Sequence, residues 1–117
     1  MDLEQFREYC LSKPHVTEGT PFGEEVIVFK VGSKIFALAS LDEVPARVNL
    51  KCDPDRALGL RDRFEEVQPG YHMNKKHWNT VTIEGAIPPR ELRAMIDHSY
   101  ELVVASLTRK ERERLGL

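Results

Sequence analysis

Segment 71–79, with the sequence YHMNKKHWN, holds the side chains best suited to a binding role. It interleaves aromatic rings with cations and side-chain amides. Aromatic rings stack on nucleic-acid bases, and Lys75, Lys76 and His77 are of the types that pair with phosphate. The alternative interpretation is a hairpin loop with solvated lysines and a Trp78 that packs into the core beneath it. For Trp78 itself we favour the core, because burial of its large apolar surface is stabilising.

Three residues are of metal-ligand types: His72, His77 and Cys52. The two histidines are five positions apart in an expected strand and loop, which would place them on opposite faces. The sequence has no C-x-x-C or H-x-x-x-H pair. It therefore predicts no metal site.

Catalytic signatures are weak. Cys52 precedes Asp53, which is suited to begin a helix, and a helix N-terminus lowers the pKa of a thiol. A lone cysteine at a strand end is nevertheless more often a small buried apolar group. The carboxylate pairs are adjacent in sequence, so their side chains do not face one another on a regular element. We therefore expect a protein that is not an enzyme, and an unrecognised catalytic site at Cys52 or His72 is the remaining alternative.

No cofactor is expected, because the sequence contains neither a G-x-G-x-x-G loop nor a Walker sequence. The 117 residues, 41% hydrophobic and 31% charged, are typical of a single globular domain over residues 1–117. The charged first residues are unlike a signal peptide, and no apolar run approaches the ~18 residues of a membrane span. Both cysteines should then be reduced in a cytoplasmic protein. A net charge of −2 leaves only a local basic patch for nucleic acid.

The pattern of apolar residues predicts helices and strands that would position these side chains. Asp2 with Gln5 begins a helix that ends at Lys13-Pro14, and Asp53-Pro54 and Pro88-Pro89 begin two more. Four strands are expected, at 26–29, 35–39, 46–51 and 80–84, and the first two are joined by a turn at Gly32-Ser33. Residues 66–73 are expected to form an irregular edge strand.

The predicted fold is an α+β two-layer sandwich, in which an antiparallel sheet of about five strands carries helices on one face. The element order is α-β-β-β-α-β-β-α, and the short connections favour antiparallel pairing. In the third strand, apolar residues alternate with Arg47, Asn49 and Lys51. That alternation places Arg47 and Lys51 together on a polar face. In the last helix, Ser99 and Tyr100 are expected on or beside the buried face.

An ordered set of short motifs resembles the MmcQ/YjbR family, and it spans most of the chain from near residue 1 to near residue 108. The matching motifs are Thr20-Pro21-Phe22-Gly23, Phe29-Lys30-Val31, Lys34-Ile35-Phe36-Ala37-Leu38, Asn49-Leu50-Lys51-Cys52, Gly70-Tyr71-His72-Met73-Asn74-Lys75-Lys76-His77-Trp78 and Asp97-His98-Ser99-Tyr100-Glu101-Leu102-Val103.

The resemblance implies an antiparallel α/β fold similar to secretion-chaperone-like and frataxin-like sandwiches. It also implies binding of double-stranded DNA through its backbone. On that hypothesis Lys75, Lys76 and His77, with Trp78 beside them, form the DNA-binding segment, assisted by Arg47 and Lys51. The alternative function is an interaction domain that binds a protein or a small ligand on the sheet face.

Overall fold

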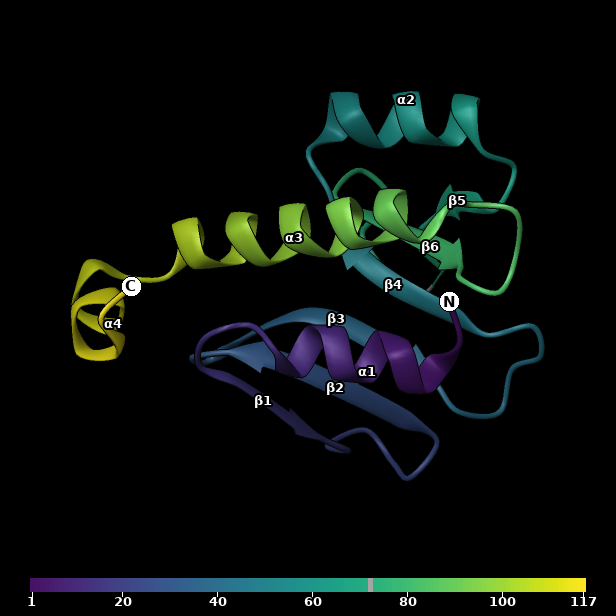
Figure 1. Ribbon diagram of the computed structural model, residues 1–117. Coiled ribbons are helices and arrows are strands. Elements are labelled where there is room, and N and C mark those ends of the chain that lie inside the picture. The colour runs from purple at the N-terminus through teal and green to yellow at the C-terminus, as the bar shows by residue number, and fades with distance from the viewer. Residues whose placement is uncertain (72) are drawn as a thin grey trace.

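One antiparallel sheet organises the chain in the computed structural model, which describes residues 1–71 and 73–117 (Figure 1). Within the described residues the sheet has six strands in the order β1-β2-β3-β4-β6-β5. The strands are β1 (Val16–Gly19), β2 (Val26–Val31), β3 (Lys34–Ser40), β4 (Arg47–Lys51), β5 (Val67–Pro69) and β6 (Trp78–Thr82). The helices are α1 (Leu3–Leu11), α2 (Pro54–Arg63), α3 (Pro89–Ser106) and α4 (Arg109–Leu115). The predicted α+β class and antiparallel sheet are confirmed.

Strands β2 and β3 form the predicted antiparallel hairpin, and neither is an edge strand of the sheet. Val31 pairs with Lys34, so only Gly32 and Ser33 lie in the turn. Gly32 has φ +58°, which a residue without a Cβ adopts at little cost. The nearly continuous apolar sequence of these two strands agrees with their position inside the sheet.

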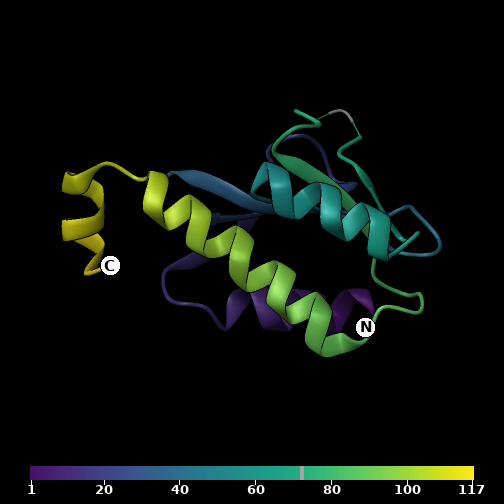
Figure 2. The same cartoon turned by 90° about the horizontal axis from the view of Figure 1, so that it is seen from above.

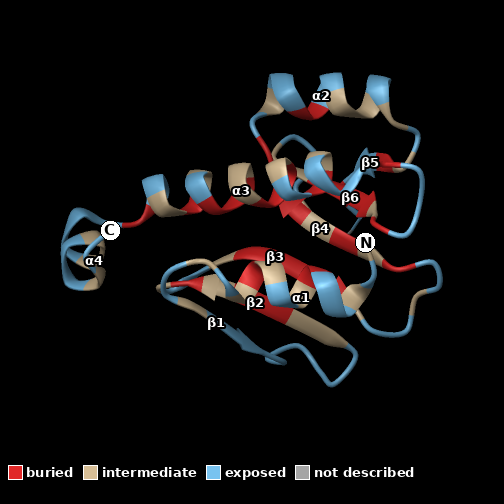
Figure 3. Cartoon of the chain, viewed as in Figure 1, coloured by how far each residue is buried: buried red, intermediate tan, exposed pale blue. Residues whose placement is uncertain are grey.

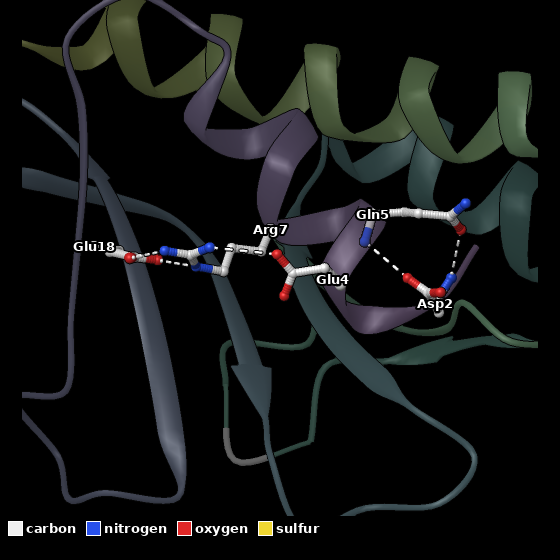
Figure 4. Close-up of polar contacts among 5 residues, drawn as sticks. All are labelled: Asp2, Glu4, Gln5, Arg7 and Glu18. Carbon is white, nitrogen blue, oxygen red and sulfur yellow. Dashed lines mark hydrogen bonds and ion pairs between the residues drawn. The ribbon is translucent and has the colours of Figure 1, made fainter.

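Helix α1 is stabilised by a cap at its N-terminus and by an ion pair between its exposed side and strand β1 (Figure 4). Asp2 accepts a hydrogen bond from the Gln5 amide, and the Gln5 side chain accepts one from the Asp2 amide, which together form a capping box. Arg7 donates two hydrogen bonds to the Glu18 carboxylate on edge strand β1, at 2.6 and 2.8 Å. Phe6, on the inner side of the helix, packs edge-on against Phe29 of β2. Helix α1 is therefore attached to the sheet by an apolar and a charged contact.

Helix α3 is attached to the sheet through Ser99 and Tyr100, which confirms their predicted inward position. Ser99 is completely buried, and its hydroxyl donates to the Phe36 carbonyl and accepts from the Lys51 amide, at 2.6 and 2.9 Å. Tyr100 packs edge-on against the Phe36 ring, and its hydroxyl donates to the Pro14 carbonyl at 2.7 Å. Figure 3 shows that the sheet-facing side of α3 is largely buried.

Two elements were absent from the predicted order. Strand β1 raises the number of strands from five to six, and the basic tail is a separate helix, α4, whose amide at Glu111 is capped by Thr108. The side chain of Glu111 accepts hydrogen bonds from both the amide and the hydroxyl of Ser33 in the β2–β3 turn. Figure 2 shows α4 at the far end of α3, beside the C-terminus. Strand β1 has no local signal, because its position depends on pairing with β2. Helix α4 has one, Thr108 with Glu111 three residues later, which sequence reasoning missed.

The two faces of the sheet differ in what covers them. Val48 and Leu50 of β4 are buried in the core with the inner residues of α1 and α3, and Leu60 of α2 packs on the same side. Strand alternation therefore directs Arg47 and Asn49 to the opposite face. Within the described residues that face is covered by loops and by no helix. None of the helices in the described residues has the length and apolar character of a membrane span.

Candidate ligand-binding cleft

A row of three residues crosses the uncovered face and forms the floor of a cleft. Leu38, Asn49 and Thr80 are direct neighbours on β3, β4 and β6. The Thr80 hydroxyl donates to Asn49 Oδ1 at 2.6 Å and accepts from the Tyr71 amide at 2.9 Å. The floor therefore holds the start of the β5–β6 loop over the sheet.

The walls of the cleft come from two loops, and both present aromatic rings to solvent. Phe22, in the β1–β2 loop, is 66% exposed, and Tyr71, in the β5–β6 loop, is 62% exposed. Gly70 allows the β5–β6 loop to lie close to β6, because a Cβ at Gly70 would stand 2.8 Å from the Cβ of Trp78 and 2.9 Å from its carbonyl oxygen. Met73 follows on the same loop and also lines the cleft.

The enclosed space is of the size that small organic ligands occupy. Its volume is about 420 Å³, within the usual range for ligand sites. The lining combines apolar and aromatic side chains with polar and charged ones; it consists of Phe22, Val26, Leu38, Ser40, Glu43, Arg47, Asn49, Tyr71, Met73 and Thr80.

Arg47 is the cationic residue that lines this cleft. Its Nε lies 3.9 Å from Glu43 Oε2, and both side chains are 38% exposed. That separation is an ion pair but too long for a hydrogen bond. The Arg47 side chain donates no hydrogen bond to any residue in the described part of the chain, and the same holds for the Asn49 side-chain nitrogen and the Ser40 hydroxyl. Hydrogen-bond donors of the cleft are therefore available to a ligand.

The residues predicted to bind DNA gather mainly at one end of the β4–β6 pair. Lys51 and Trp78 are direct partners, and the His77 carbonyl accepts a hydrogen bond from the amide of Cys52. Lys75 and Lys76 are exposed in the loop that enters β6. Arg47 is not with them, because it lies four residues along β4 from Lys51, about 13 Å away. The structure thus separates the predicted set into a basic end and a cleft residue.

The prediction that Trp78 packs into the core is wrong. It begins β6 and is half-buried on the uncovered face, whereas Asn79 beside it is buried. The cause is strand alternation: Val81 faces the helices, so Asn79 does too, and Trp78 points to the other side. Sequence reasoning placed Trp78 in a loop and could not assign it a face.

Arg61 of α2 supports the basic end, and sequence reasoning missed it. Its Nε donates to Asn79 Oδ1 at 2.8 Å, which satisfies this buried amide. Its Nη2 donates to the carbonyls of Lys75 and Trp78. Arg61 therefore holds both ends of the segment that carries the lysines.

Cys52 is the alternative catalytic residue that lies in the described part of the chain. Cys52 is buried, and burial raises the pKa of its thiol, which disfavours the thiolate. The Nε2 of His98 lines the same small cavity but accepts a hydrogen bond from the Asp53 amide at 3.1 Å. This imidazole is therefore not positioned to activate Cys52. His72 lies outside the described residues, and the described residues contain no cluster of three possible metal ligands.

Comparison with known proteins identifies the family of this chain. The YjbR family model matches residues 11–102. The chain belongs to the YjbR family. It is 42% identical over 113 residues to protein YbdF of Escherichia coli O157:H7, with 96% of this chain and 92% of that protein covered. It is 30% identical over 115 residues to protein YjbR of Escherichia coli strain K12, with 98% of each covered.

Solved structures of similar proteins share the family fold. The crystal structure of Deinococcus radiodurans protein DR2400, described as a DUF419 domain, superposes with a TM-score of 0.92 and 40% identity, and the match covers 99% of this chain and 88% of that one. A crystal structure from Pseudomonas syringae gives a TM-score of 0.77 at 27% identity, with 87% of this chain and 98% of that one covered. The resemblance to the family inferred from the short motifs is confirmed. These names state no ligand, so the choice of ligand depends on the site itself.

Proposed function

We propose that this YjbR-family protein is a non-enzymatic binding module that holds a small organic ligand in the cleft on its uncovered sheet face. The observation that carries the proposal is the pair of exposed aromatic rings, Phe22 and Tyr71, supplied by two different loops over one floor. Large aromatic side chains left in water cost free energy, and a flat apolar ligand between them would remove that surface from water. The ligand class is one with a planar apolar group.

The cleft favours a small ligand over a macromolecule. Its volume of about 420 Å³ fits a ligand of drug-like size, and its floor is closed by the Asn49–Thr80 hydrogen bond. Both walls come from loops, which adjust to an occupant more readily than strands do. Leu38, which is only 9% exposed, gives the β3 end of the floor an apolar contact.

The test is a fluorescence titration with N-phenyl-1-naphthylamine, a neutral aromatic probe that brightens in apolar surroundings. We expect saturable binding at one site. The double variant Phe22→Ala, Tyr71→Ala should weaken it about tenfold, because it removes both ring contacts, each of them worth roughly 0.5–1.5 kcal/mol beyond area burial. Both side chains are largely exposed, so the fold should be retained.

The control is Leu58→Ala on α2, which removes another exposed apolar side chain, 58% accessible, from an element on the other face of the sheet. This variant should bind the probe as the native chain does. Absence of saturable binding to the native chain, or equal loss in both variants, would contradict the proposal.

Duplex DNA is a second candidate ligand, favoured by the gathering of Lys51, Lys75 and Lys76 at one end of the sheet. This end is distinct from the cleft and is held by the Arg61 hydrogen bonds. Backbone contacts of this kind carry affinity without sequence information. A chain with net charge −2 would bind weakly and with strong dependence on salt.

The measurement is a duplex titration at several salt concentrations. The double variant Lys75→Ala, Lys76→Ala should reduce the slope of log affinity against log salt by about 1 to 2 if both lysines contact phosphate. The matched control is Lys110→Ala, an exposed lysine on α4. No binding by the native chain at low salt would remove DNA as a candidate.

A further inference from the structure

The polar groups of the cleft point to the charge of its ligand. We infer that the cleft binds aromatic anions, in which a carboxylate, sulfonate or phosphate group on a planar ring system is held by Arg47. This inference rests on the proposed binding of a small ligand in the cleft. It adds the identity of the group that orients the ligand and selects it.

The argument begins with the hydrogen bonds that the cleft has already formed. On the floor, Asn49 Oδ1 accepts from the Thr80 hydroxyl, and the Thr80 oxygen accepts from the Tyr71 amide. The acceptor capacity of the floor is therefore largely used within the protein. What remains is the Asn49 amide nitrogen, which donates to no residue in the described part of the chain. Its two N–H groups are donors in need of an acceptor.

The other available donors lie beside that amide. Arg47 and Asn49 are two residues apart on β4 and therefore share a face, roughly 7 Å apart along the strand. Ser40 ends the neighbouring strand β3, one residue beyond Ala39, which pairs with Val48. The guanidinium, amide and hydroxyl thus all line the cleft, together with the aromatic rings of its walls. A ligand with acceptor oxygens at one end and a ring at the other complements this arrangement.

Glu43 is the carboxylate that lines the described part of the cleft, and its position has to be reconciled with an anionic ligand. It stands 3.9 Å from Arg47 and makes no hydrogen bond to it. An ion pair between two half-exposed side chains contributes little. A ligand oxyanion that accepts hydrogen bonds directly from the guanidinium forms a stronger contact, of the charge-assisted kind. Glu43, in the connection between β3 and β4, then turns to solvent, and its charge weakens the binding of the anion.

The experiment compares two probes that differ in one charged group. 8-Anilinonaphthalene-1-sulfonate carries a sulfonate that N-phenyl-1-naphthylamine lacks, and both are titrated by fluorescence against the native chain. We expect the sulfonate probe to bind about tenfold more tightly, the effect of one hydrogen-bonded charge. Arg47→Gln should bring the ratio of the two affinities close to one, because the sulfonate then has no guanidinium to accept from. Glu43→Gln should have the opposite effect and raise the affinity for the sulfonate probe about threefold, because it removes a negative charge beside the bound anion.

Two control variants keep the result specific to the cleft. Arg109→Gln removes an arginine that is also paired with a glutamate four residues away, Glu113, but on α4. The Lys75→Ala, Lys76→Ala variant removes two of the three lysines of the basic end. Neither should alter the affinity for the sulfonate probe, and circular dichroism of every variant should match that of the native chain.

Each outcome has one interpretation. If the neutral probe binds but Arg47→Gln leaves the ratio of the two affinities unchanged, the inference of an anionic ligand is wrong and the proposed cleft stands. If the lysine variant removes the preference instead, the anion is bound at the basic end and the inference is again wrong. If neither probe binds, both the proposed function and the inference of an anionic ligand are wrong.

Discussion

Replacing Phe36 with alanine should lower the free energy of unfolding by about 3–5 kcal/mol, the range for deletion of a large buried ring. The Phe36 ring is fully buried in the centre of the sheet and packs edge-on against Tyr100 of α3, with ring centroids 5.4 Å apart. Its removal leaves a cavity that two rigid elements cannot close. Part of the loss is the aromatic pair itself, since the Tyr100 ring would then face the cavity.

Urea unfolding followed by circular dichroism measures this loss. The matched control is Phe22→Ala, the same chemical deletion at a side chain that is 66% exposed, which should change stability by less than about 0.5 kcal/mol. Phe36→Leu should lose less than the alanine variant, because it fills more of the space. Similar losses for Phe36→Ala and Phe22→Ala would show that the packing described here is wrong.

Replacing Ser99 with alanine should cost about 2–3 kcal/mol, although it removes a single oxygen atom. The β3–β4 pairing runs from Ala39–Val48 to Ala37–Leu50. At the next position the Ser99 hydroxyl lies between the strands and bonds both the Phe36 carbonyl and the Lys51 amide. Alanine would leave these two backbone groups without a partner, and a buried polar group left unsatisfied costs roughly 1–3 kcal/mol.

Ser106→Ala supplies the control on the same helix. Its hydroxyl donates to the Val103 carbonyl within α3 and accepts a long, 3.4 Å hydrogen bond from Lys34, and the residue is exposed, so its loss should be small. Hydrogen exchange at the Lys51 amide provides a second measurement, because that amide should lose protection in Ser99→Ala while the rest of β4 retains it. Full protection of this amide in the variant would contradict the bridging role of Ser99.

The elements whose signals are local were predictable from the sequence. The capping box at Asp2 and Gln5, the helix start at Asp53-Pro54 and the Gly32-Ser33 turn each involve residues within a few positions of one another. Their hydrogen bonds and backbone angles depend little on the rest of the chain. The alternation in β4 was predictable for the same reason, and it correctly assigned Arg47 and Lys51 to one face.

The elements that depend on distant partners were not predictable in this way. Strand β1 is short and polar, and its position depends on pairing with β2 and on the bonds from Arg7 to Glu18. Helix α4 has a local N-cap at Thr108, and its position beside the β2–β3 turn depends on the contact of Glu111 with Ser33, 78 positions away in sequence. Mixed charges at the end of a chain are equally consistent with a frayed tail.

In the candidate site, too, local features were predictable from the sequence and contacts between distant segments were not. The types and order of Lys75, Lys76 and Trp78 were readable in one segment, and pairing of Trp78 with Lys51 extends that segment to β4. The cleft instead joins Phe22 to Tyr71, which are far apart in sequence and carry no shared pattern. Only the tertiary structure brings these two loops over one floor. The order of the neighbouring strands β3, β4 and β6 decides which residues form that floor and which loops lie above it. The sequence by itself therefore determined the family, helices α1, α2 and α3, and the polar face of β4, whereas the packing of distant segments decided where a ligand can bind.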